Sequence, residues 1–245
     1  MTGITNIAVG SYSSDMMNRL AGLILIILVT AFAACKNNND APTPTLSTSL
    51  DVVNASADTV NFYLNGTRLN VNSNLYPSGS SGYFTVLAGQ QNYQVKDRFN
   101  PAGNTVQQLF NIPLSLDTSQ YYSLFIGGTQ ASDAFYSTDI LLLDTVTNTC
   151  LVRFVNASPD AGGLSMALGD TTQFVSQPFK SVSDFTLIGI SGLKPVKVYQ
   201  EGSSTPVYQN TIELLQGKSY TFFSKGSIGG KGTKAFSVGV AVNVN

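Results

Sequence analysis

The sequence has no histidine, no tryptophan, two cysteines and only 11% charged residues among its 245 positions. Without histidine the commonest general base and metal ligand is missing, and Ser–His–Asp and Cys–His catalytic arrangements are excluded. Ordinary soluble domains carry about 25% charged residues. The net charge of −1 gives no electrostatic basis for binding nucleic acid or an anionic membrane. We therefore predict no nucleic-acid partner and no histidine-dependent chemistry.

One short motif occurs twice, 102 residues apart, as Val53-Asn54-Ala55-Ser56-Ala57-Asp58 and Val155-Asn156-Ala157-Ser158-Pro159-Asp160. Each copy follows an apolar, β-branched run, and its Asn, Ser and Asp side chains favour turns because they hydrogen-bond to nearby backbone. The next segment of each copy alternates apolar and polar residues and ends in Asn65-Gly66 or Gly169-Asp170. This pattern predicts a strand, a turn and a β-hairpin in each copy.

The repeat continues with three further blocks in the same order. Residues 84–87 align with 185–188, 94–96 with 197–199, and 122–125 with 220–223. Four matched blocks at similar spacing indicate duplication of a domain of about 100 residues.

The repeated turn, the apolar strand after it and the later Ser-Tyr-Thr-Phe-Phe strand resemble the bacterial secreted family called domain of unknown function 4397. The resemblance covers residues 49–245 as two copies, and the first copy has Ala57 where the second has Pro159. It implies an extracytoplasmic β-sandwich-like domain, often attached to envelope lipoproteins. It brings no established activity and no catalytic residues.

Turn residues recur throughout both halves, with short alternating strands between them, and no apolar helical pattern is sustained after residue 35. This organisation predicts an all-β protein with two tandem, Ig-like antiparallel β-sandwich domains, at residues 49–147 and 148–245. A barrel is the alternative. Because each half is expected to have its own core, we expect each half to fold alone. The alternating segment from Phe236 to Val244 predicts a final strand that pairs within its domain.

Residues 1–34 have the pattern of a lipoprotein signal peptide. Arg19 precedes an apolar run from Leu20 to Val29, and Ala33-Ala34 precede Cys35. The run is shorter than the ~20 residues that a membrane span needs, so a transmembrane anchor is the weaker alternative. Met16 or Met17 are alternative starts. We predict lipidation of Cys35, a flexible tether over residues 35–48, and attachment to the outer membrane on either face.

Asn54, Asp58, Asn156 and Asp160 are predicted to be structural acceptors in the repeated turns. Because Asp58 and Asp160 belong to separate domains, they are expected to lie far apart. Calcium binding and catalysis are the alternatives, but the turn lacks the dense acidic spacing of a calcium loop. No metal site and no cofactor are predicted. Cys150, the second cysteine, is interpreted as a small buried residue rather than a reactive thiol.

Aromatic residues beside Gly/Ser-rich loops are the candidate ligand contacts, because such side chains stack on sugars or anchor partners. The plainer interpretation is that each packs on its own domain. The candidates are Tyr76, Tyr83, Phe99, Tyr199 and Tyr208.

The sequence thus predicts a lipid-anchored envelope protein that is a non-catalytic binding or structural module, with an unidentified glycan or protein partner. A carbohydrate-binding accessory lipoprotein is one alternative, and exposed aromatics in a row would favour it. A carboxylate-dependent hydrolase is the other, and two carboxylates about 5–10 Å apart in a cleft would favour it.

Overall fold

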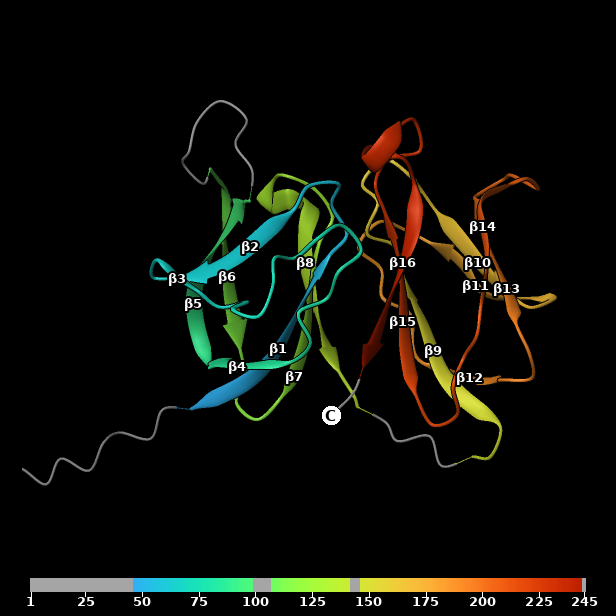
Figure 1. Ribbon diagram of the computed structural model, residues 1–245, viewed down its shortest axis with the longest axis horizontal. Helices are drawn as coiled ribbons and strands as arrows, with labels where there is room; N and C mark the ends of the chain where they lie inside the picture. Colours follow the sequence, from blue (N-terminus) through green and yellow to red (C-terminus); the bar gives the residue numbers. More distant parts are fainter. Residues whose placement is uncertain (1–45, 99–106, 142–145, 244–245) are drawn as a thin grey trace, which may run out of the picture. The chain divides into compact units, whose positions relative to one another are not determined.

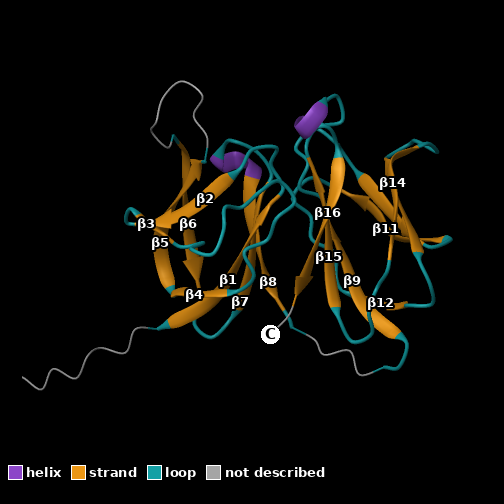
Figure 2. Cartoon of the chain, in the orientation of Figure 1, coloured by secondary structure: helices purple, strands orange, loops and turns teal. Residues whose placement is uncertain are grey.

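The computed structural model describes residues 46–98, 107–141 and 146–243, and Thr45–Asn245 form one compact unit (Figures 1 and 2). Strands dominate, and the two helical segments are single 3₁₀ turns, η1 (Ala131–Asp133) and η2 (Gly232–Lys234). Across the described ranges, no helix is long and apolar enough to span a bilayer. Cys35 and Phe99 lie outside the described residues.

Domain 1 consists of two facing sheets of four strands, in the orders β4-β1-β7-β8 and β3-β2-β5-β6. Its strands are β1 (Ser47–Asn54), β2 (Val60–Leu64), β3 (Thr67–Arg68), β4 (Phe84–Leu87), β5 (Gly89–Asp97), β6 (Gln108–Leu116), β7 (Tyr121–Ile126) and β8 (Ala134–Asp139).

Domain 2 repeats this topology strand for strand, with sheets in the orders β12-β9-β15-β16 and β11-β10-β13-β14. Even the 3₁₀ turn before the last strand recurs. The strands are β9 (Thr149–Val155), β10 (Leu164–Leu168), β11 (Thr171–Gln177), β12 (Thr186–Gly189), β13 (Lys194–Gln200), β14 (Pro206–Ile212), β15 (Ser219–Lys225) and β16 (Ser237–Asn243).

The predicted all-β fold of two tandem sandwiches is confirmed. The strand pairs are antiparallel except for one pair in each domain, since β1 runs parallel to β7 and β9 runs parallel to β15. Alternation of apolar residues cannot reveal strand direction, because parallel and antiparallel strands share the same two-residue side-chain period. The parallel pair brings the first strand of each domain into the middle of its sheet.

The predicted hairpins form at the expected turns. Asn65 and Gly66, between β2 and β3, have φ values of 50° and 80°, the left-handed conformation that a tight two-residue hairpin requires. Gly169, between β10 and β11, has φ 73°. The predicted last strand is β16, and it pairs with β15 along its whole length.

One predicted alignment between the copies is wrong by one residue. Thr48 on β1 pairs with Val86, and Cys150 on β9 pairs with Ile188. Residues 84–87 therefore correspond to 186–189 rather than to 185–188. Since a one-residue shift exchanges the two faces of a strand, this correction decides which side chains are equivalent, and it makes Tyr83 the counterpart of Phe185.

Each domain has its own apolar core between its two sheets. Phe62 and Tyr93 stack within the first core, with ring centroids 4.8 Å apart, and Phe154 and Phe222 lie in the second. A tyrosine closes the same loop in both domains. The Tyr122 hydroxyl accepts a hydrogen bond from the Asp117 amide at 3.1 Å, and the Tyr220 hydroxyl accepts one from the Leu215 amide at 2.9 Å.

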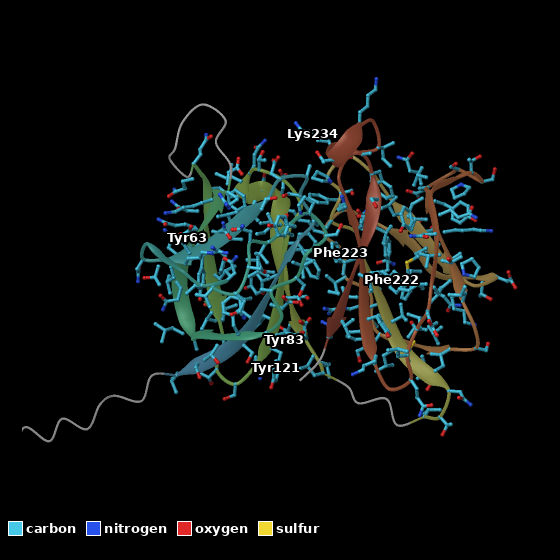
Figure 3. The ribbon with its side chains drawn as sticks, viewed as in Figure 1. Tyr63, Tyr83, Tyr121, Phe222, Phe223 and Lys234 are labelled. Carbon is cyan, nitrogen blue, oxygen red and sulfur yellow. The ribbon has the colours of Figure 1, made fainter. Side chains whose placement is uncertain are left out.

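A third apolar cluster joins the two domains. The outer face of sheet β4-β1-β7-β8 packs against the outer face of sheet β12-β9-β15-β16, and Figure 3 shows Phe223 at this junction. The two copies use the same patch of their surface, as in an isologous dimer. The cluster pairs Val53 with Val155, Ala55 with Ala157, and Phe125 with Phe223 as equivalent positions, and it also contains Ala241.

Candidate functional site

The repeated turn of domain 1 is organised by the side chain of Asn54, which is fully buried at the end of β1. Its amide nitrogen donates to the backbone carbonyls of Asp58 at 2.7 Å and Leu75 at 2.8 Å. Its oxygen accepts from the amide of Ser56 at 3.0 Å and from the Ser56 hydroxyl at 2.7 Å. All four hydrogen-bonding positions of this amide are therefore in use.

Asn156 organises the second repeated turn in the same way, directly after β9, but some of its hydrogen-bond partners differ. Its nitrogen donates to the carbonyls of Gly162 at 2.8 Å and Gln177 at 2.9 Å. Its oxygen accepts from the Ser158 amide at 3.2 Å and from the Ser224 hydroxyl at 3.0 Å. Ser224 lies on β15, so in domain 2 the turn is also bonded to the neighbouring strand.

Asp58 and Asp160 are placed differently from the two asparagines. Their carboxylates do not cap their own turns in the contacts of the described residues. The Asp160 carboxylate accepts hydrogen bonds from the Ser227 hydroxyl at 2.5 Å and the Ile228 amide at 3.3 Å, both in the loop after β15. Asp58 takes part in its turn through its backbone amide and carbonyl.

The expectation that Asp58 and Asp160 lie far apart is wrong. Both turns line one hollow of about 320 Å³ at the junction of the domains. The outer-face packing causes this, because it brings the ends of β1 and β9, and the turns that follow them, to the junction of the domains. Besides the two aspartates, the hollow is lined by Ser56, Ala57, Gly127, Gly128, Thr129, Asp133, Pro159, Gly226, Ser227 and Lys234.

Glycines in the walls of this hollow allow the backbones of the two domains to approach each other closely. A Cβ on Gly127 would lie 2.4 Å from the carbonyl oxygen of Ala157 in the other domain. The amide of Gly226 in turn faces the Ala55 carbonyl at 3.4 Å. Three aspartates and Lys234 are among the residues that line the hollow, which gives it a polar lining; Figure 3 shows Lys234 at this end.

A buried ion pair links the domains farther along the same strands. Arg153 Nη1 on β9 lies 2.7 Å from Asp139 Oδ1 on β8, and the two side chains are 3% and 0% exposed. Arg153 Nε also donates to Thr221 at 2.8 Å, and the guanidinium lies over the ring of Phe185. Arg153 lies in the apolar run that precedes the second repeated turn, residues 151–155.

The Asp139 carboxylate accepts hydrogen bonds from two hydroxyl groups of domain 1. Tyr83 donates to Asp139 Oδ2 at 2.6 Å and Ser123 donates to the same oxygen at 2.5 Å. Tyr83 also accepts a hydrogen bond from Asn243 of domain 2 at 3.1 Å. Tyr83, a predicted ligand contact, is thus part of the domain junction.

The network uses equivalent positions of the two copies but different side chains. Repetition of one set of residues would give two identical groups facing each other, whereas the actual residues are complementary. The equivalent pairs, taken from the strand registers, are Asp51 with Arg153, Ser123 with Thr221, Asp139 with Asn243, and Tyr83 with Phe185.

Burial raises the pKa of two side chains in this region. The pKa of Asp51 is raised mainly by desolvation and also by the charge of Asp139, against hydrogen bonds from Ser80 and Ser81 that lower it. The pKa of Tyr83 is likewise raised, first by burial and then by the neighbouring Asp139 carboxylate. Both groups therefore favour their neutral forms.

The remaining predicted aromatics do not form an exposed row. Tyr76 is exposed, Tyr199 is half-buried, and Tyr208 packs against the core of domain 2. Cys150 is completely buried in that core. Within the described ranges no cluster of His, Cys, Asp or Glu is arranged to hold a metal ion.

Removal of one partner of the Arg153–Asp139 pair should be strongly destabilising. Asp139→Leu leaves the arginine buried and unpaired, and we expect it to lower the free energy of unfolding by about 3–5 kcal/mol. The double variant Asp139→Leu with Arg153→Met should recover most of that loss. Urea unfolding measures all three proteins, with Asp117→Asn as an exposed control. A double variant that is less stable than Asp139→Leu alone would contradict this assignment.

Asp51→Asn should change the pH dependence of stability. Since the folded-state pKa of Asp51 is raised, its contribution to stability is present below about pH 4 and is lost as the pH rises through the folded-state value. The variant should therefore be more stable than the wild type at neutral pH, by a difference that shrinks as the pH falls toward 4. Urea unfolding across this range tests it, and a difference independent of pH would count against a raised pKa.

Comparison with curated proteins gives no match. Among solved structures, a similar chain is CBMbc of family CBM26 from Eubacterium rectale Amy13K, in complex with maltoheptaose. It shows 12% sequence identity over 78% of this chain and 96% of that chain, at a TM-score of 0.25. A TM-score of this size does not show a common fold.

The family comparison agrees with the resemblance carried by the repeated turn. The matched segment begins within β1, includes β2 to β9 and ends within β10 of domain 2. Residues 48–167 match the family described as Domain of unknown function (DUF4397), so the similarity to that family covers about one copy of the repeat.

Proposed function

We propose that the protein is a lipid-anchored, non-catalytic binding module of a bacterial cell envelope. Acylation of Cys35 attaches it to the outer membrane, and its ligand occupies the hollow between the two repeated turns. The observation that carries this proposal is the hollow itself, because neither copy of the domain can form it alone.

The direction of β1 supports this arrangement. The strand begins at Ser47, so the last two residues of the predicted tether belong to β1, and it ends at Asn54 in the repeated turn. An eight-residue strand spans about 26 Å. The hollow therefore lies at the end of the domains away from the tether, where it is accessible when Cys35 is held in a membrane.

A hydroxyl-rich glycan is the ligand class that the lining favours. Carboxylates such as those of Asp58 and Asp133 accept hydrogen bonds from sugar hydroxyls, and Lys234 supplies a donor. The volume of about 320 Å³ lies at the small end of ligand pockets. Recognition would depend on hydrogen bonds rather than on stacking, because Tyr76, Tyr83, Tyr199 and Tyr208 are not among the residues that line the hollow.

A carboxylate-dependent hydrolase is the second candidate, because Asp58, Asp133 and Asp160 line the same hollow. Such an enzyme needs one carboxyl group as the acid and another as the base or nucleophile. Asp160 is already bonded to Ser227 and Ile228, so Asp58 and Asp133 are the two carboxyl groups that such an enzyme would use.

A glycan array tests the ligand site. Residues 36–245 should bind a defined set of glycans, and Ala57→Trp, which fills the hollow, should abolish that binding. Ala88→Trp at the opposite end of domain 1 is the matched control and should bind as the wild type does. Binding that survives Ala57→Trp would remove the hollow as the site. Release of reducing sugar from a bound glycan, lost in Asp58→Asn, would favour the hydrolase instead.

Cys35→Ala tests the anchor. The variant should appear in the soluble fraction or remain as an uncleaved precursor, because it has no sulfur to acylate. Fractionation of cells and labelling with a fatty acid measure both effects, and Cys150→Ala is the control that should stay at the membrane. Normal processing of Cys35→Ala with wild-type membrane attachment would overturn the lipoprotein assignment.

A further inference from the structure

Exposed leucines gather at the end of the molecule where the tether joins domain 1. Leu46 is 62% exposed, Leu87 43%, Leu193 67% and Leu215 56%. Single exposed apolar residues are ordinary on soluble proteins. Four large ones at one end, in loops and strand ends of both domains, form a set that we call the tether-end leucines.

Backbone hydrogen bonds place each of these residues at the start of a central strand. In domain 1 the carbonyl of Leu46 accepts from the Ala88 amide at 2.9 Å, which sets Leu87 beside the beginning of β1.

Domain 2 has the same arrangement. The Ile190 amide donates to the Asn148 carbonyl and the Gly217 amide donates to the Thr149 carbonyl, both at 3.0 Å. Leu193 and Leu215 therefore lie in the two loops beside the beginning of β9.

The tether-end leucines of the two domains lie on the same side of the molecule, opposite the hollow. The repeated turns, at the far ends of β1 and β9, meet in one hollow, and Tyr83 of domain 1 contacts Asn243 at the near end of β16. In Figure 1, β1 and β9 both begin toward the lower edge, and Figure 3 shows Tyr83 and Tyr121 low on domain 1. Exposed leucines therefore occur at this end in both domains, beside exposed charged residues such as Asp117 and Lys218.

We propose that the tether-end leucines rest on the lipid surface to which Cys35 is anchored. This inference rests on the proposed function, because acylation brings this end to the membrane. Cys35 precedes Leu46 by eleven residues, a segment that extends at most about 40 Å. The anchored domains are thus confined near the bilayer with their leucines on the tethered side.

The chemistry of the contact is hydrophobic rather than electrostatic. The net charge of −1 gives the chain no overall attraction to anionic headgroups. Apolar side chains that enter the interface add to the affinity of an acyl anchor, and stable attachment generally needs such a second contribution. Contact by both domains would also fix their orientation, so that the hollow between the turns faces away from the bilayer.

Vesicle binding by residues 36–245 tests the contact without the acyl group, since this chain retains the whole compact unit. The probe is vesicles of phosphatidylethanolamine and phosphatidylglycerol. The wild type should bind weakly and independently of salt, and Leu193→Asp with Leu215→Asp should lower the partition coefficient about tenfold. The matched control is Val71→Asp with Val175→Asp, two residues 73% and 64% exposed elsewhere on the surface.

The outcomes separate the lipid contact from the anchor. Equal losses in the two double variants, or no binding by the wild type, would overturn the lipid contact. If Cys35→Ala nevertheless releases the full-length protein from the membrane, the assignment of Cys35 as the lipid anchor still holds. Light scattering identifies the competing partner: if the leucine variant converts a dimer to a monomer while vesicle binding is absent, the leucines join two copies of the chain and the proposal is wrong.

Discussion

The structure depends on one constraint, which is that the two sheets at the centre of the molecule are covered on both faces. Strands β1, β7, β9 and β15 contribute one face to their own sandwich core and the other to the junction between the domains. Consecutive residues such as Val52 and Val53 are therefore both buried. The two domains are therefore not independent units on one chain, because each covers apolar surface of the other.

Every polar group at this double-sided junction needs a partner, since an unpaired buried charge is costly. The copies have diverged to supply it: Arg153 occupies the position in domain 2 that is equivalent to Asp51, and it pairs with Asp139 across the junction. At the end of the domains that carries the repeated turns, the side-chain amides of Asn54 and Asn156 donate hydrogen bonds to backbone carbonyls of the turn and of neighbouring segments. These bonds hold the turns in position, and the hollow between them follows from that placement.

Sequence reasoning predicted the features that depend on local pattern and repetition. The strands, the hairpins at Asn65-Gly66 and Gly169-Asp170, and the two sandwiches all follow from alternation and turn chemistry. Features that depend on packing between the copies were not predicted, because a repeat shows that two domains share a fold but not which faces meet. The approach of Asp58 to Asp160 and the role of Tyr83 belong to this group. A signal was available in Arg153, since a lone arginine in the middle of an apolar strand requires a buried partner.

The central claim is that the two copies form a single cooperative unit, although each has its own core. Calorimetry of residues 36–245 tests it most directly. The account predicts one transition whose calorimetric and van 't Hoff enthalpies agree, with residues 49–147 and 148–245 melting at lower temperatures when separated. Two transitions in the intact chain, at the midpoints of the separated halves, would contradict it.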